Sequence, residues 1–199
     1  PFYFSMDKRI LPHEFYDRPT LTVAQELLGA TLVRVEKDVQ IAGIIVETEA
    51  YVGESDLGCH AKAGKTPRTA IMYGMPGRAY VYFTYGMHWM LNAVTEAEGF
   101  PAAVLIRAIH PTEGVEIIAS RRGKQPRTYW TDGPAKLTQA LAIDKSFNGI
   151  DLCNSESGLW IESGKRVLEK NVTTSARVGL YTVPEPWKSK PWRFQISTL

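Results

Sequence analysis

The sequence predicts an α+β fold: a single domain over residues 1–199 with a curved, mostly antiparallel β-sheet at its core and helices around it. The chain is 44% hydrophobic and 22% charged, the balance of a soluble globular protein with one substantial core. Short apolar, β-branched runs recur and are mostly joined by short turns, which favours antiparallel pairing. Stretches with helical spacing lie between these runs, and no internal repeat or linker divides the chain.

The first predicted element is a helix over residues 19–28. Its apolar side chains recur with helical spacing, and Gly29 is a typical residue for ending it. Thr20 or Thr22 can act as the N-cap, because a threonine hydroxyl accepts a backbone N–H that the first helical turn leaves free.

Strands are predicted next. Residues 31–36 and 41–49 read as a hairpin joined by residues 37–40, since both runs are rich in β-branched side chains. Residues 80–94 supply one or two further strands. Residues 102–109 supply another, which is apolar apart from Arg107.

Helices and short strands complete the chain. One helix is predicted to open at residues 111–114 and to run towards Arg121. A second opens at residues 132–134, where Pro134 falls in the first turn, a position that needs no N–H donor. Short strands are predicted at residues 159–162, 177–180 and 193–196.

Several classes of protein are disfavoured by composition. No apolar stretch approaches the roughly 18 residues of a membrane span, and residues 1–5 lack the basic region and apolar core of a signal peptide. Cys59 and Cys153 are the only cysteines, and neither they nor the four histidines show the spacing of a metal motif. We therefore predict reduced thiols, no metal and no membrane association.

Basic residues gather in three loops. The net charge of +2 does not by itself indicate nucleic acid, but residues 60–68, 121–127 and 187–193 each carry several cations in a glycine- or proline-bearing stretch. One such loop is more commonly a solvated surface. Three of them, beside a cluster of aromatic residues, favour contact with phosphates.

Two carboxylates and a phenol share one face of a predicted strand. Glu47, Glu49 and Tyr51 alternate at the end of the apolar run 41–45, and charged groups there are costly unless they are paired or used. Such a group can activate a water and hold a flat aromatic substrate. The alternative for Glu49 is a salt-bridged structural acid, and Glu47 is interpreted as supporting.

A second segment, residues 79–92, holds five aromatic rings and a histidine. Tyr80 and Tyr82 alternate as strand residues do, whereas Tyr85 falls out of phase beside Gly86. Tyr85 is therefore predicted at an exposed turn, as a wedge or binding anchor. The alternative is an ordinary surface tyrosine.

These segments resemble the alkyladenine (3-methyladenine) DNA glycosylase family, the mammalian type that also occurs in bacteria. The similarity follows the family order along nearly the whole chain, and no single segment carries it alone. The matching segments are residues 15–16, 24–29, 46–51, 60, 66–68, 76–77, 80–82, 85–87, 92, 104–108, 133–137, 139–143 and 190–194.

The resemblance implies a function. Members of this family bind duplex DNA that contains damaged purines, flip the lesion out and hydrolyse its N-glycosidic bond, without a metal or cofactor. The implied substrates are 3-methyladenine, 7-methylguanine, hypoxanthine and 1,N6-ethenoadenine. A carboxylate rather than an amine at the reacting position predicts a monofunctional enzyme without lyase activity. We expect a monomer, placed in the cytoplasm with the nucleoid if bacterial and in the nucleus if eukaryotic.

The resemblance also implies roles for individual residues. Glu49 matches the general base that activates the water. Tyr85 matches the residue that fills the gap left by the flipped nucleotide. Tyr51, His60 and Tyr82 match the walls of the base pocket, where aromatic stacking holds the base.

Further residues match supporting positions. Asn92 matches a selectivity residue whose amide collides with the 2-amino group of guanine. Lys62, Lys65 and Arg68 are candidate phosphate contacts. Met72 is placed beside the neighbour of the lesion. Arg107 either fixes Glu49 or reaches a phosphate.

Two other functions remain open from the sequence. One is a non-catalytic protein that binds DNA damage, which Glu49 argues against because such a protein needs no base. The other is a small-molecule transferase on a related fold. It is weakened because the chain lacks a dinucleotide fingerprint, a P-loop and a nucleophile elbow.

Overall fold

The computed structural model describes residues 9–197, so the start considered above for a signal peptide lies outside the described residues. Within that range one eight-stranded sheet is accompanied by four α-helices and several 3₁₀ turns. The helices are α1 (His13–Tyr16), α2 (Thr20–Glu26), α3 (Val115–Arg122) and α4 (Pro134–Ala140). The strands are β1 (Thr31–Glu36), β2 (Val39–Val52), β3 (Ala79–Thr84), β4 (His88–Val94), β5 (Ala102–Glu113), β6 (Leu159–Glu162), β7 (Val172–Ser175) and β8 (Arg193–Ile196).

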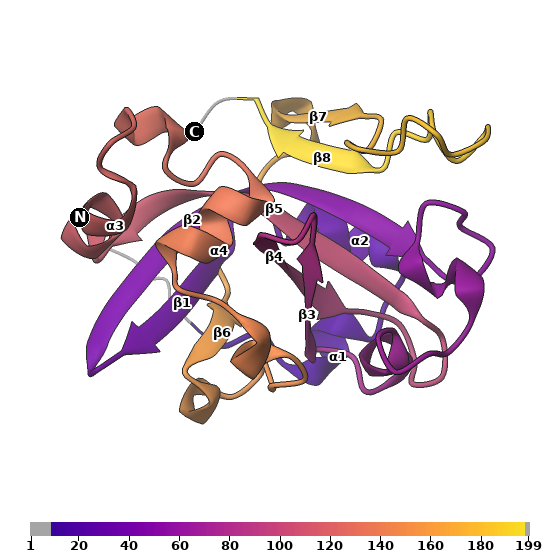
Figure 1. Cartoon of the computed structure of the whole chain (residues 1–199), viewed down its shortest axis with the longest axis horizontal. Coiled ribbons are helices and arrows are strands. Elements are labelled where there is room, and N and C mark those ends of the chain that lie inside the picture. Colours follow the sequence, from indigo (N-terminus) through magenta and orange to yellow (C-terminus); the bar gives the residue numbers. More distant parts are fainter. Residues whose placement is uncertain (1–8, 198–199) are drawn as a thin grey trace.

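The sheet confirms the predicted fold class. Its main order is β3-β4-β5-β2-β1-β6, and every pair of neighbouring strands is antiparallel. The long strand β2 is central, since it pairs with β1, β5 and β8. Figure 1 shows β7 and β8 along the upper edge of the molecule, against one end of β2.

Helices cover both faces of the sheet. In Figure 1, α4 crosses in front of the sheet and α2 lies behind it. Side chains alternate along β5: Val104 and Ile106 belong to the main buried core, whereas Leu105 and Arg107 point to the opposite side, where they line a cavity. Each fully buried aliphatic side chain of this kind contributes about 1.5–3 kcal/mol to stability.

The first helix is confirmed but shorter than predicted, and its predicted cap is wrong. Pro19 is the N-cap of α2, and neither threonine caps the helix through its side chain. Glu96 takes that role from a distant turn, because its carboxylate accepts both the backbone N–H of Thr20 at 3.1 Å and the Thr20 hydroxyl at 2.6 Å.

The β1–β2 hairpin is confirmed with a tighter turn than predicted. Lys37 and Asp38 both have positive φ, 48° and 64°, so two residues complete the turn and β2 starts at Val39. This backbone geometry matches the twist of the strands on either side.

The predicted helix start at residues 111–114 is wrong, because β5 continues to Glu113 and α3 begins only at Val115. Pro111 is tolerated in the strand because it pairs with Gly43 beside a shift in register. Gly114, with φ of 63°, turns the chain into α3. The other helix is confirmed, with Gly133 as the N-cap of α4.

Two of the three late strands are confirmed as β6 and β8, and the third is wrong. Residues 177–180 form a loop, while β7 lies just before them. The physical reason is visible in the loop: the Arg177 side chain is buried in an ion pair, and Gly179 has φ of 83°, outside the strand region.

Candidate active site

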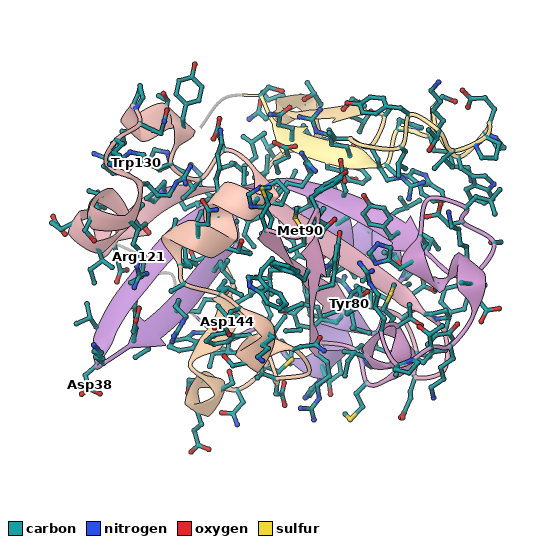
Figure 2. The ribbon with its side chains drawn as sticks, viewed as in Figure 1. Asp38, Tyr80, Met90, Arg121, Trp130 and Asp144 are labelled. Carbon is teal, nitrogen blue, oxygen red and sulfur yellow. The ribbon has the colours of Figure 1, made fainter. Side chains whose placement is uncertain are left out.

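A cavity of about 450 Å³ opens on the face of the sheet that carries α4. Its walls come from β3, β4, β5, the start of α4, the turn around His60 and the loop 178–180. Figure 2 places the wall residues Tyr80 and Met90 near the middle of the view, with Asp38 at the outer end of the β1–β2 hairpin. The predicted site residues that line it are Tyr51, His60, Met72, Tyr82, Tyr85, Asn92 and Arg107.

Glu49 lies directly beneath the floor of this cavity. Its side chain is fully buried, yet both carboxylate oxygens are satisfied. Oε2 accepts the Tyr51 hydroxyl at 2.7 Å, while Oε1 accepts the Val178 backbone N–H at 2.7 Å and lies 3.4 Å from the Arg107 guanidinium. All three of these partners line the cavity, so Glu49 is held at its edge by two hydrogen bonds and an ion pair.

The protonation of Tyr51 suits this role as a donor. Burial, followed by the charge of Glu49, raises the pKa of Tyr51 well above its ordinary value. The phenol therefore keeps its proton near neutral pH and donates it to the carboxylate, which is the arrangement that stabilises a buried anion.

Arg107 contacts both acids, as the first of the two alternatives from the sequence describes, while its contact with a phosphate stays a prediction. Its Nε donates to Glu47 at 2.6 Å, and Arg193 donates to the same oxygen at 2.6 Å. Burial acts to lower the pKa of Arg107, but Glu49 and Glu47 outweigh it and the pKa is raised. In this structure Arg107 therefore fixes the carboxylates, and Glu47 is held between two guanidinium groups.

Three rings form an aromatic wall. His60 meets Tyr82 edge to face with centroids 4.5 Å apart, and Tyr80 lies 5.3 Å from Tyr82. The Nδ1 of His60 shares a 3.0 Å hydrogen bond with the Tyr80 hydroxyl. Alternation along the sequence predicts only that Tyr80 is a strand residue, because this pattern cannot distinguish a tyrosine in the core from a tyrosine that lines a cavity.

His60 is neutral at physiological pH. Burial, then the nearby cations Arg68 and Lys62, lower its pKa to about 4. A neutral imidazole offers one donor and one acceptor, so it can bond to the edge of a base or to Tyr80 without carrying charge into the cavity.

The lowered pKa of His60 predicts a pH dependence of stability. Between pH 6.5 and about 4, His60 is protonated in the unfolded chain but stays neutral in the folded protein. The free energy of unfolding therefore falls as the pH drops through this window. In urea unfolding at several pH values, the free energy of unfolding should fall less steeply with decreasing pH for His60→Gln than for the wild type. His110→Gln, at an exposed position, is the control. Parallel curves for wild type and His60→Gln would contradict the assignment.

Asn92 and Met72 lie in the cavity wall. Asn92 is 3% exposed, and its amide nitrogen donates to the Tyr80 carbonyl at 3.0 Å, which fixes the orientation of the side chain. Met72 is 1% exposed and packs in the small core cluster beneath the aromatic wall. In this structure Met72 supports the wall, and its contact with a neighbouring nucleotide stays a prediction.

Exposed apolar residues lie on two segments beside the cavity. Tyr85 is 80% exposed at the tip of the β3–β4 hairpin, where its φ of 53° and that of Gly86, 68°, form a two-residue turn. Met87 beside it is also exposed. On the second segment Tyr181 is 76% exposed, next in sequence to the lining residue Leu180.

The predicted cations Lys62, Lys65 and Arg68 are not among the residues that line the cavity. The Arg68 guanidinium sits 5.4 Å from the Tyr82 ring, Lys62 donates to the Leu57 carbonyl and Lys65 faces the Tyr73 ring. A further cation, Lys136, does line the cavity and pairs with Asp132 at 2.8 Å. The sequence contained no signal that singled out Lys136.

The sequence also missed a buried ion pair that holds the loop above Glu49. Arg177 and Asp56 are both fully buried at their side chains and pair through two contacts of 2.5 and 2.8 Å. The guanidinium lies 4.8 Å from the Tyr51 ring and also donates to the Ala50 carbonyl. In the sequence Arg177 is an isolated arginine in a short apolar run, and that pattern predicts a strand residue rather than a member of a buried ion pair.

Comparison with known proteins agrees with this geometry. Residues 14–198 match the sequence profile of the family described as methylpurine-DNA glycosylase (MPG). The chain is 49% identical to a protein of Methanocella arvoryzae, with 93% of this chain and 91% of the relative aligned. It is 46% identical to a protein of Carboxydothermus hydrogenoformans, over 94% of this chain and 95% of the relative. Both relatives carry the name "Putative 3-methyladenine DNA glycosylase". The chain therefore belongs to the methylpurine-DNA glycosylase family.

Proposed function

We propose that this protein is a monofunctional glycosylase that removes damaged purines from duplex DNA by hydrolysis. Membership of the family supports the coarser activity, that of a DNA glycosylase in base excision repair. The observation that carries the finer proposal is the position of Glu49, a buried carboxylate held by two hydrogen bonds and an ion pair, whose three partners all line an aromatic-walled cavity.

In the proposed reaction Glu49 takes a proton from a water that attacks C1′ of the flipped nucleotide. The C1′–N bond to the purine breaks as the new C–O bond forms, the bonding electrons leave with the base, and the products are a free base and an abasic site. The carboxylate also favours the positive charge that develops on the sugar. A water placed among Tyr51, Arg107 and Val178 would lie next to the carboxylate that these groups contact.

The walls of the cavity support a purine substrate. Stacking on Tyr82 and its neighbours tolerates different bases, at about 1–3 kcal/mol per stacked base. A positively charged alkylated purine gains a further cation–π attraction. We propose as substrates 3-methyladenine, 7-methylguanine, hypoxanthine and 1,N6-ethenoadenine, with the Asn92 amide excluding normal guanine by collision with its 2-amino group.

The remaining proposals concern the DNA and the whole molecule. Lys62, Lys65 and Arg68 would contact phosphates, giving affinity that falls with salt. We propose that the chain acts as one glycosylase domain and as a monomer, in the compartment that holds the chromosome. No helix in the described part of the chain is both long and apolar enough to cross a lipid bilayer.

The direct test is base release from a duplex that contains one hypoxanthine or one 1,N6-ethenoadenine. Strand breakage that depends on added alkali is expected, because a hydrolytic enzyme leaves an intact abasic strand. Breakage without alkali would overturn the monofunctional assignment. Tight lesion binding with no abasic product would favour a damage-binding protein instead.

Tyr85→Ala is expected to weaken binding to lesion-containing duplex and to lower base release by roughly ten- to a hundred-fold, because the exposed ring that would replace the flipped base is lost. Tyr85→Phe keeps the ring and should retain most of the activity. Tyr129→Ala removes an exposed tyrosine that does not line the cavity and serves as the matched control. Equal activity of Tyr85→Ala and Tyr129→Ala would remove Tyr85 from the mechanism.

A further inference from the structure

A second group of chemically active side chains lies at the base of the β3–β4 hairpin. His13 of α1 meets Asp151 and Cys153 of the loop before β6, and one ligand atom from each lies within 4.8 Å of the others. None of the three lines the cavity described above. An isolated antiparallel β-bridge between the backbones of Asp151 and Arg78 connects this group to the hairpin, since Arg78 is the residue just before β3.

The orientation of His13 turns one ring nitrogen towards Asp151. Its Nδ1 lies 2.8 Å from the Pro76 carbonyl, and because a carbonyl can only accept, Nδ1 carries the proton. The other ring nitrogen, Nε2, faces Asp151 Oδ2 at 3.3 Å. A second hydrogen bond that fixes the tautomer in this way is the usual companion of a metal-binding histidine.

The backbone makes room at the same place. A Cβ atom on Gly77 would come within 2.6 Å of the Cys153 sulfur and 3.1 Å of His13 Nδ1. Gly77 has φ of 83°, so glycine is favoured there on both steric and conformational grounds. Only a residue without a side chain allows the chain to pass this close to the thiol.

An unpaired polar atom points to the same group. The Tyr16 hydroxyl is buried and has no hydrogen-bond partner among the described residues. The Tyr16 ring lies close to this group, because a Cβ atom on Gly77 would come within 3.1 Å of Tyr16 Cδ2 and 2.6 Å of the Cys153 sulfur. Burial raises the pKa of Tyr16 well above the usual value, and the charges of Cys153 and Asp151 raise it further. A buried donor without a partner needs an explanation, and a bound ion with its water supplies one.

We propose that His13 Nε2, Asp151 Oδ2 and Cys153 Sγ form a zinc-binding site. A nitrogen, oxygen and sulfur donor set suits Zn²⁺, whereas Mg²⁺ and Ca²⁺ take oxygen ligands. Two ligands at about 2.0 Å from one tetrahedral ion lie about 3.3 Å apart, the separation found here between nitrogen and oxygen. On binding, the thiol releases its proton to solvent and a water fills the fourth position.

The proposed ion would join segments that are distant in sequence. His13 lies at the start of α1, and Asp151 and Cys153 lie some way from it along the chain, next to the hairpin that carries Tyr85. The site is therefore structural: it would tie α1 and the 151–153 loop to the base of the hairpin. Spacing along the sequence led to the opposite prediction of no metal, because a three-ligand set assembled across the fold has no local motif.

Titration of the metal-free protein with Co²⁺ tests the proposal directly. A thiolate bound to tetrahedral Co²⁺ gives a charge-transfer band in the near ultraviolet, together with strong visible bands. One equivalent is expected to produce both, and excess Zn²⁺ should remove them. The bands should be absent in Cys153→Ser and greatly weakened in His13→Gln, but unchanged in Cys59→Ser, which removes the other thiol.

Thermal unfolding provides the second measurement. Added Zn²⁺ should raise Tm of the wild type and of Cys59→Ser by several degrees and leave Cys153→Ser unmoved. Similar Tm values without metal would show that all variants fold. No cobalt bands in the wild type, or bands that survive in Cys153→Ser, would overturn the proposal. Base release should be unaffected by chelators well below Tm, so this result is independent of the proposed glycosylase activity.

Discussion

Glu49→Gln is expected to lower the rate of base release by about 10²–10⁴-fold, the contribution usual for general acid–base catalysis. Glutamine keeps the shape of the side chain: its carbonyl oxygen can accept from the Val178 amide, while its NH2 group can donate to the Tyr51 hydroxyl oxygen, which reverses that one hydrogen bond. It cannot take a proton from water or carry the negative charge that favours the reacting sugar. Binding to a lesion-containing duplex should therefore persist while single-turnover base release is nearly lost.

Glu47→Gln is the matched control for this experiment. It removes the same carboxylate from the same face of β2, two residues away, but this acid is already held between Arg107 and Arg193. We expect a smaller loss of base release, caused by the altered position of Arg107. Equal losses in the two variants would mean that the acids only organise the site and that neither acts as the base.

Asp56→Asn is expected to lower the free energy of unfolding by about 3–5 kcal/mol. Its carboxylate is fully buried and bonds twice to Arg177, so its removal leaves a guanidinium charge without a counterion in the interior. The cost is dominated by this unpaired charge. Urea unfolding, with midpoint and slope measured together, gives the change directly.

The control for the buried pair is an exposed one. Asp132→Asn breaks the pair with Lys136, where both side chains are about 40% exposed, and such surface pairs contribute about 0–1 kcal/mol. The double variant Asp56→Leu with Arg177→Met removes both buried charges and should be more stable than Asp56→Asn alone. If Asp56→Asn lowers the free energy of unfolding as little as Asp132→Asn does, the Arg177 guanidinium has found another partner.

The two predictions are coupled through the loop that follows Arg177. Val178 donates to Glu49, and its position depends on the anchored arginine beside it. Asp56→Asn should therefore also reduce base release at temperatures where the protein remains folded. This ion pair thus has two roles, since it stabilises the molecule and holds a donor against the proposed base.

Local patterns predicted the features that depend on neighbouring residues. Alternation in β2 and β3 predicted Glu49 and Tyr51 on one face, and the break in phase at Tyr85 predicted the exposed tip that the structure shows. The errors arose where a distant group decided the outcome. Glu96 took over the capping of α2, and pairing with Gly43 kept Pro111 in a strand.

The sequence by itself determined the α+β class, the order of most elements and the family, because these follow from periodicity and from motifs spread along the whole chain. Only the tertiary structure decided how Glu49 is held. Its partners come from β2, β5 and the 178 loop, and charge pairs such as Arg177 with Asp56 join residues far apart along the chain. Such contacts leave no local pattern, since electrostatic and hydrogen-bond partners are selected by proximity in the folded chain.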